Sequence, residues 1–179
     1  MNSDGYTRTI EHGKKLVDTG GLRKSYRPER IIVLLVGEAP PSNGTFFYRC
    51  DSNLFRYTKE AFATAFNLQF NSDTDFLTFF RGRGFFLDDL RLQPIDRADR
   101  LRQRQAAVGS LAIRIQDYHP KYVFAVMKGI EPHVREAVSL AAVKPTVIRA
   151  VDFPAHGHHS DYVRGLTAIL RELIAAGAI

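Results

Sequence analysis

The chain has 179 residues, of which 45% are hydrophobic and 25% are charged, values typical of one folded domain with a core of its own. Its formal net charge of +6 permits contact with nucleic acid or phosphate but does not require it. The single cysteine, Cys50, excludes a disulfide within the chain and a cluster held by four of its thiolates. The longest apolar run, Ile31 to Val36, is too short to span a bilayer, and the first residues lack an apolar signal region. We therefore expect a cytoplasmic protein with a single domain over residues 1–179.

Helical and strand-like segments alternate along the chain. The first helix is predicted over residues 6–18, with Gly20-Gly21 as its end, and a basic loop follows from Arg23 to Arg30. Short apolar segments rich in β-branched or aromatic residues predict strands at 31–37, 84–90, 121–129 and 146–154. Further helices are predicted over 57–68, 97–117, 131–142 and from Ser160 to the end. Strands that alternate with helices indicate an α/β fold with a mainly parallel, four-stranded sheet.

Three unusual loops follow the predicted strands. They are GEAPPSNGTFFYR after the first strand, LDDL at the end of the second and FPAHGHHSD after the fourth. In parallel α/β sheets, ligands bind beyond the carboxyl ends of the strands. Because these ends lie at one edge of the sheet, we expect the three loops to form a common site.

The loop after the first strand has a stiff backbone. Gly37 lets the chain leave the strand sharply, and Pro40-Pro41 restricts the backbone that follows. This arrangement suits Glu38 to position a water or a polar ligand, although an ordinary turn with a solvated glutamate has the same sequence. The aromatic run at 46–48 follows in the loop, where rings either close the core or stack on a flat ligand.

The motifs in these loops resemble those of the uracil-DNA glycosylase superfamily, whose fold is a four-stranded parallel sheet between layers of helices. GEAP, Gly37 to Pro40, is similar to the GEAPG motif of the thermophilic-type bacterial uracil-DNA glycosylases. GTFFYRCDSNLF, Gly44 to Phe55, is similar to the segment that follows this motif in the mismatch-specific uracil/thymine branch. The resemblance runs from Ile31 to Leu173 and implies a three-layer α/β/α sandwich.

The resemblance also implies an activity, namely hydrolysis of the N-glycosidic bond of a damaged or deaminated base in DNA, with no cofactor and no metal. DNA is the implied partner, held through a basic surface. Glu38 would position the attacking water, within a loop that includes Gly37 and Pro40. Phe47, or Phe46 as the second choice, would stack on the flipped base.

The remaining site residues implied by the resemblance come from later segments. Asn53 belongs to the substrate-binding segment, and Asp88 or Asp89 would face the edge of the base. A histidine of the last loop, His156 or His159, would act at the glycosidic bond, where the departing base becomes an anion.

The chain departs from the family pattern in three places. It lacks the four-cysteine cluster that GEAP-type enzymes carry, and it has Asp88-Asp89 where uracil-specific members read the base with asparagine. The family's final His-Pro-Ser motif is replaced by Phe153-Pro154-Ala155, with three histidines just downstream, at 156, 158 and 159. Either one of these histidines acts from a shifted position or catalysis is lost. A module that binds a nucleobase, nucleotide or DNA without cleavage is therefore the alternative, and a small-molecule hydrolase that uses Glu38 and a histidine is a third hypothesis.

Two further features have both a structural and a functional interpretation. The HGHH cluster at 156–159 fits a solvated loop before a helix better than a metal site, because no carboxylate or thiolate stands at ligand spacing. Arg104 falls on the same predicted apolar stripe as Leu101. An inward arginine usually forms an ion pair or extends its stem along apolar surface, although it could also reach a phosphate or the carboxylates at 88–89.

Overall fold

Four parallel strands form the central sheet of the computed structural model, which describes residues 19–145, 147–155 and 157–179. The strands are β1 (Val33–Gly37), β2 (Phe85–Asp89), β3 (Tyr122–Ala125) and β4 (Val147–Ala150), in the order β2-β1-β3-β4. The register sets Gly37 of β1 beside Asp89 of β2. All three strand pairs are parallel, so the predicted α/β fold with a four-stranded parallel sheet is confirmed.

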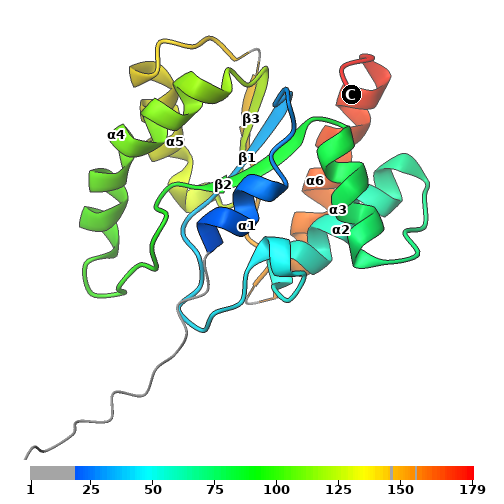
Figure 1. The fold of residues 1–179 in the computed structure, drawn as a ribbon, viewed down its shortest axis with the longest axis horizontal. Coiled ribbons are helices and arrows are strands. Elements are labelled where there is room, and N and C mark those ends of the chain that lie inside the picture. Colours follow the sequence, from blue (N-terminus) through cyan, green and yellow to red (C-terminus); the bar gives the residue numbers. More distant parts are fainter. Residues whose placement is uncertain (1–18, 146, 156) are drawn as a thin grey trace, which may run out of the picture.

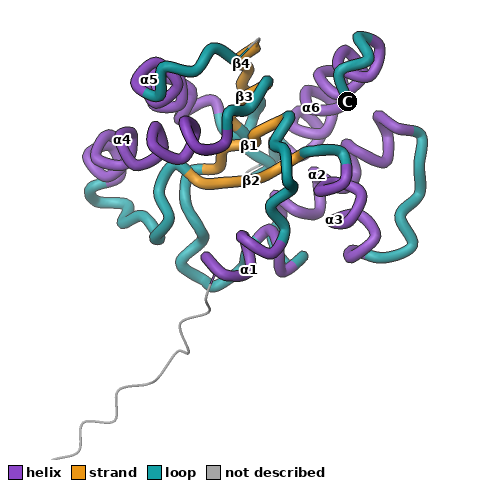
Figure 2. Tube along the Cα trace, turned by 45° about the horizontal axis from the view of Figure 1, so that its top comes forward, coloured by secondary structure: helices purple, strands orange, loops and turns teal. Residues whose placement is uncertain are grey.

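Helices cover both faces of the sheet. They are α1 (Thr19–Ser25), α2 (Asn53–Phe66), α3 (Asp73–Gly82), α4 (Arg100–Tyr118), α5 (Glu131–Leu140) and α6 (His159–Ala175), with short 3-10 helices η1 (Phe47–Arg49) and η2 (Lys128–Ile130). Figure 1 shows α4 and α5 on one side of the sheet and α2, α3 and α6 on the other, which makes three layers. The tilted view of Figure 2 shows the strands as a layer between these helices, with α1 on the β2 side. Among the described residues, no helix combines the length and apolar character that crossing a membrane requires.

Two helices lie where the sequence analysis predicted none. α1 contains Gly20-Gly21, the predicted helix end, and continues to Ser25, so the loop predicted from Arg23 to Arg30 begins only at Tyr26. Glycine disfavours a helix, but Arg23 of α1 forms buried ion pairs that hold this segment in place. α3 begins with a capping residue, Ser72, whose hydroxyl accepts a hydrogen bond from the Asp75 N–H at 3.0 Å. The helix predicted over 6–18 lies outside the described residues.

The helix predicted over 97–117 corresponds to α4, but Leu101 was wrongly predicted to belong to its apolar stripe. Leu101 is 72% exposed and does not belong to the core. Arg104 is buried on that face together with Val108 and Leu111, as the spacing predicted.

A cluster of phenylalanines packs the α2–α3 layer against the sheet. Phe62 of α2 lies 4.8 Å from Phe85 of β2 between ring centroids, and 5.4 Å from both Phe76 and Phe80 of α3. Most of these rings meet edge to face, the arrangement that the ring quadrupoles favour. The cluster fixes the layer that leads into β2, and therefore the position at which β2 ends.

Tyr48 attaches the loop after β1 to the outer edge of the sheet. Its hydroxyl donates to the carbonyl oxygen of Leu87 at 3.0 Å and accepts from the N–H of Leu87 at 2.8 Å. β2 is an edge strand, so these two backbone groups have no strand partner on that side. Burial raises the pKa of Tyr48 well above its usual value, so the phenol stays protonated and can donate. One side chain thus satisfies a buried donor and a buried acceptor.

Replacing Tyr48 with phenylalanine should destabilise the fold, because it leaves the Leu87 N–H and C=O buried and unpaired. We expect Tyr48→Phe to lower the free energy of unfolding by roughly 1–3 kcal/mol. Tyr57→Phe is the matched control, since the Tyr57 hydroxyl makes no hydrogen bond within the described part of the chain. Urea denaturation of both variants measures the difference, and equal midpoints would contradict this role of the Tyr48 hydroxyl.

Candidate functional site

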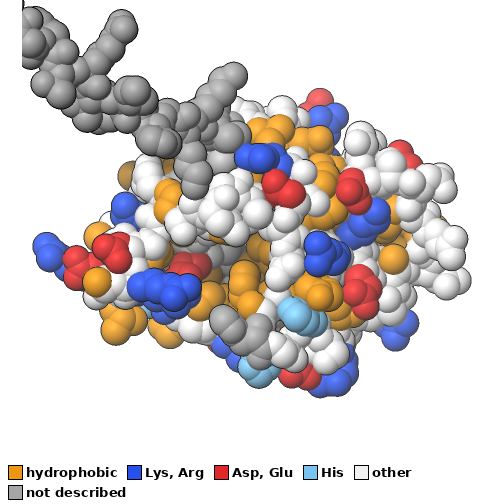
Figure 3. All heavy atoms as spheres, turned by 90° about the horizontal axis from the view of Figure 1, so that it is seen from below, with side chains coloured by type: hydrophobic (Ala, Val, Ile, Leu, Met, Phe, Trp, Pro, Cys, Tyr) orange, Lys and Arg blue, Asp and Glu red, His pale blue; other side chains and the backbone are white. Residues whose placement is uncertain are grey.

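A cleft of about 650 Å³ opens at the carboxyl ends of the strands and receives residues from all three loops. Gly37 and Glu38 line it from the end of β1, and Asp89 lines it from the end of β2. Phe153 and His158 contribute from the segment after β4. Figure 3 looks onto the molecule from below, where a hollowed area with apolar side chains is surrounded by charged side chains and histidine. The three loops therefore meet at one cleft large enough for a nucleoside-sized ligand.

Two arginines of α4 bind Glu38. The Arg100 side chain is bidentate, with Nε 2.6 Å from Oε1 and Nη2 2.5 Å from Oε2. The Nε and Nη2 atoms of Arg104 each lie 2.6 Å from Oε1, and its Nη1 donates to the carbonyl oxygen of Gly129 at 3.2 Å. Arg104 therefore has a structural role, as an inward ion-pair partner, and it contacts Glu38 rather than Asp88 or Asp89.

The arginines decide the protonation state of Glu38. Partial burial alone would raise the pKa of this carboxyl, but hydrogen bonds from Arg100 and Arg104 and their positive charges lower it below its usual value. Glu38 is consequently an anion at neutral pH and a weak proton acceptor. Its two oxygens differ, because Oε1 meets both guanidinium groups whereas Oε2 meets only Arg100. Oε2 retains capacity to accept a hydrogen bond from a water or ligand.

A buried charge cluster holds the end of β2. Arg23 of α1 lies 3.2 Å from Asp88 Oδ1 and 2.5 Å from Asp89 Oδ2, and Arg114 of α4 lies 3.0 Å from Asp88 Oδ2. Tyr118 donates to Asp88 Oδ2 at 3.0 Å, and the Asp89 N–H donates to Asp88 Oδ1 at 2.8 Å. Asp88 is fully buried and does not line the cleft, so it is a structural partner of both arginines.

Asp89 is the carboxylate of this pair that reaches the cleft. Burial raises its pKa to about 6, against the opposing effect of Arg23, and the neighbouring Asp88 adds to the rise. Its Oδ2 binds Arg23, whereas Oδ1 has no hydrogen-bond partner among the described residues. Oδ1 rests against Gly37, where an added Cβ would meet it at 2.4 Å. Gly37 is therefore needed for this close approach as well as for leaving the strand.

The aromatic residues of the first loop belong mainly to the core. Phe46 is 2% exposed and Phe47 is 3% exposed, although both contribute to the wall of the cleft. Phe47 packs edge to face on Phe55 and Tyr48, with ring centroids 5.6 Å and 5.1 Å away. Phe46 lies under the Arg23 guanidinium at 5.3 Å. Neither ring presents an open face to a ligand, so the structural interpretation of the aromatic run is the one supported by the packing.

The remaining predicted site residues do not all line the cleft. Pro40 and Asn53 line the cleft, and Asn53 begins α2 just after the capping residue Ser52. His159 does not line it, because its ring stacks on Tyr57 at a centroid distance of 4.4 Å. His156 lies outside the described residues.

Of the histidines that the structure describes in the last loop, His158 lines the cleft. Its Nδ1 lies 3.4 Å from Asp161 Oδ2, a contact between residues three apart at the start of α6. The carboxylate orients the ring, and the Nε2 atom has no partner among the described residues, so it is available to a ligand.

Sequence reasoning did not identify Arg100 and Arg23 as site residues. Both depend on tertiary contacts, since Arg100 is 62 residues from Glu38 and Arg23 is 66 residues from Asp89. Within the described residues, no three histidine, cysteine or carboxylate side chains lie close enough together to hold a metal ion.

Comparisons with known proteins do not assign this chain to a family. No protein-family model matches it, and no curated protein is significantly similar to it. The geometry of the cleft is therefore the basis for the function proposed below.

Gly37→Ala should disturb the cleft, because the new methyl group collides with Asp89 Oδ1 while Arg23 holds that carboxylate. We expect a loss of stability of about 1–3 kcal/mol, the usual cost of overpacking. Gly109→Ala in α4 is the control, since nothing lies within 4 Å of its added Cβ, and alanine there should stabilise by up to about 1 kcal/mol. Thermal unfolding of both variants checks the contrast, and a neutral Gly37→Ala would show that Asp89 moves freely.

Proposed function

We propose that this protein binds DNA and hydrolyses the N-glycosidic bond of a damaged or deaminated base that is flipped into the cleft. One observation carries the proposal: among the four carboxylates that line the cleft, Glu38 and Asp89 have environments that push their pKa values in opposite directions. Such a pair is typical of sites that divide charge stabilisation and proton handling between two groups. The motif resemblance to uracil-DNA glycosylases and the parallel four-stranded sheet agree with this assignment.

Glu38 acts in this mechanism as a fixed anion. When the bond between C1′ and the base nitrogen breaks, its electron pair leaves with the base and positive charge develops on the sugar. The carboxylate stabilises that charge, and its Oε2 atom accepts a hydrogen bond from the water that adds to C1′. The proton that this water loses offsets the proton that the base anion takes up, so the products are the sugar hydroxyl and the neutral base. The two arginines keep Glu38 ionised and immobile, so little reorganisation is needed during the reaction.

Asp89 reads the edge of the base. Above its pKa of about 6 it is mainly a carboxylate, which accepts hydrogen bonds and cannot donate them. It therefore suits hypoxanthine, whose N1–H lies between one carbonyl group and C2–H, better than uracil or xanthine, in which an N–H is flanked by two carbonyl oxygens. His158, on the opposite loop, donates from Nε2 to the departing base when both of its ring nitrogens are protonated, because Nδ1–H is directed to Asp161.

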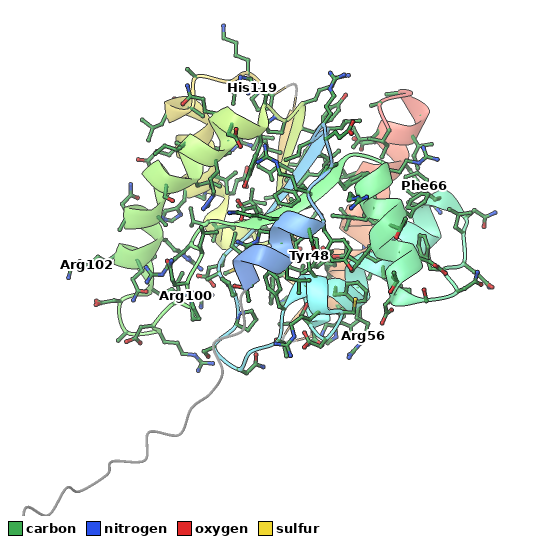
Figure 4. The ribbon with its side chains drawn as sticks, in the orientation of Figure 1. Tyr48, Arg56, Phe66, Arg100, Arg102 and His119 are labelled. Carbon is green, nitrogen blue, oxygen red and sulfur yellow. The ribbon has the colours of Figure 1, made fainter. Side chains whose placement is uncertain are left out.

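The arginine side chains at the cleft supply the contact to DNA. Arg97 and Arg100 line it and are exposed, and Arg100 keeps its Nη1 atom unpaired within the described residues after binding Glu38. A guanidinium so placed binds a backbone phosphate. Figure 4 shows that Arg102, two residues later on α4, points away from the molecule, so only part of the basic charge of this helix faces the cleft.

A specific observation favours a second candidate, binding of a base without cleavage. Both guanidinium groups that contact Glu38 reduce its basicity, and Oε1 is already occupied by them. If Glu38 serves only to hold Arg100 and Arg104, the cleft binds DNA or a nucleobase and performs no chemistry.

Incubation with oligonucleotides that carry uracil, hypoxanthine, xanthine or a G·T mismatch decides between the two candidates. We expect abasic sites with wild-type protein, and a loss on the order of 100-fold with Glu38→Gln, because the amide does not carry the negative charge. Binding of the same oligonucleotides, followed by fluorescence anisotropy, should change only a few-fold in this variant. Glu136→Gln on α5 is the control for an exposed glutamate.

Two outcomes count against the hydrolase. Binding without any abasic site in the wild type would establish the binding module instead. Equal cleavage by wild type and Glu38→Gln would exclude Glu38 as the group that stabilises the sugar.

The pH dependence of base selection tests the role of Asp89. As the pH falls through about 6, Asp89 gains a proton and loses acceptor capacity towards the N1–H of hypoxanthine, so action on hypoxanthine should decline. Asp89→Asn should abolish this dependence between pH 5 and 8 and should improve uracil relative to hypoxanthine, because the amide both donates and accepts. Asp99→Asn, an exposed change whose carboxylate makes no hydrogen bond among the described residues, is the control. Identical profiles for wild type and Asp89→Asn would exclude Asp89 as the reader of the base.

A further inference from the structure

Phe153 is an aromatic side chain at the cleft that is not part of the core. It is 38% exposed and lines the cleft, whereas Phe46 and Phe47 on the opposite loop are 2% and 3% exposed. It makes no ring–ring contact within the described part of the chain, and it is absent from the packed apolar cluster that includes both other rings. An open aromatic face is therefore present at Phe153 and not at the residues that the motif resemblance implied.

The backbone around Phe153 is held in place. Val151 extends the strand pairing, with its N–H donating to the carbonyl oxygen of Ala125 at 3.0 Å. Asp152 binds Lys128 at 2.8 Å, and the carbonyl oxygen of Phe153 accepts from the Ala155 N–H at 2.8 Å. Pro154, which is buried, has a fixed φ and restricts the backbone of Phe153 before it. The ring is thus carried by a short, hydrogen-bonded turn directly after β4.

We propose that Phe153 is the stacking platform for a flat heteroaromatic ring in the cleft, a positioning role for a nucleobase that rests on the proposed function. Stacking needs one exposed ring face, and it tolerates different bases because every base has a π-face. The polar residues that can read the ring edge, Asp89 and His158, line the same cleft. Phe153 binds the ring by stacking, and Asp89 and His158 select which base is bound.

The absence of tryptophan from the sequence makes the proposal directly measurable. Phe153→Trp introduces a single indole at the proposed platform, and a base stacked on it should quench its fluorescence. Phe66→Trp on α2 is the control, because Phe66 packs on Phe62 and Phe79 and does not line the cleft; Figure 4 shows it on the far side of the molecule from Arg100. The probes are free hypoxanthine and uracil and a mixed-sequence single-stranded oligonucleotide.

Saturable quenching of Phe153→Trp by a free base or the oligonucleotide, with no quenching of Phe66→Trp, is the expected result. Absence of saturable quenching with all three probes overturns the proposal. Equal quenching of both variants also overturns it, because the effect would then be collisional.

Affinity gives a second readout. Phe153→Ala should weaken binding of the oligonucleotide, or raise KM at unchanged kcat, on the order of 10- to 100-fold. Phe153→Tyr should restore it, since the flat face is kept. The thermal midpoint of Phe153→Ala should stay close to that of the wild type, because the ring is outside the packed core.

The two hypotheses fail in different experiments. Quenching and a loss of affinity in Phe153→Ala without abasic sites would retain the platform and remove the hydrolase. Abasic sites formed equally by wild type and Phe153→Ala would retain the hydrolase and remove the platform.

Discussion

The charge cluster at the end of β2 is the constraint on which the cleft depends. Two neighbouring carboxylates, Asp88 and Asp89, are buried there, and both would be costly to ionise without partners. Arg23 from α1 and Arg114 from α4 provide the compensating charge, so three elements far apart in the sequence must pack together before the strand end is stable. This packing gives the two acids different surroundings. Asp88 is enclosed by partners, whereas Asp89 lines the cleft and keeps one oxygen without a hydrogen bond among the described residues.

The same principle explains why the cleft contains carboxylates of different character. Glu38 is partly exposed and bound by two arginines, so its charge is stabilised. Asp89 is buried beside another acid and shares its arginine with it, so its charge is opposed. Glu38 directly follows β1 and Asp89 ends the adjacent strand β2, so the register of Gly37 with Asp89 brings both side chains to the same edge. Neighbouring parallel strands thereby bring two acids with different proton affinities into one cleft.

Much of the fold is predictable from sequence because the signals are local. Continuous apolar runs such as the one ending at Gly37 form strands buried on both faces, and alternation with helical patterns sets the layers. α1 was not predicted because its glycines argue against a helix and because the contacts that hold it, including those of Arg23 with the carboxylates of β2, are tertiary. The sequence predicts which loops form the site, because the carboxyl ends of parallel strands lie at the same edge of the sheet. Its details were not, because the burial of Phe47 and the binding of Arg100 to Glu38 are tertiary contacts.

The hydroxyl of Tyr48 also bears on how the molecule behaves at high concentration. β2 lies at the margin of the sheet, and an uncovered marginal strand is a template on which another chain can add a strand of its own. Tyr48 occupies the outward donor and acceptor of Leu87 at the middle of this five-residue strand. An incoming strand would have to displace a buried phenol before it could form consecutive ladder bonds. A side chain that fixes the loop of the cleft thus also protects the sheet from edge-to-edge aggregation.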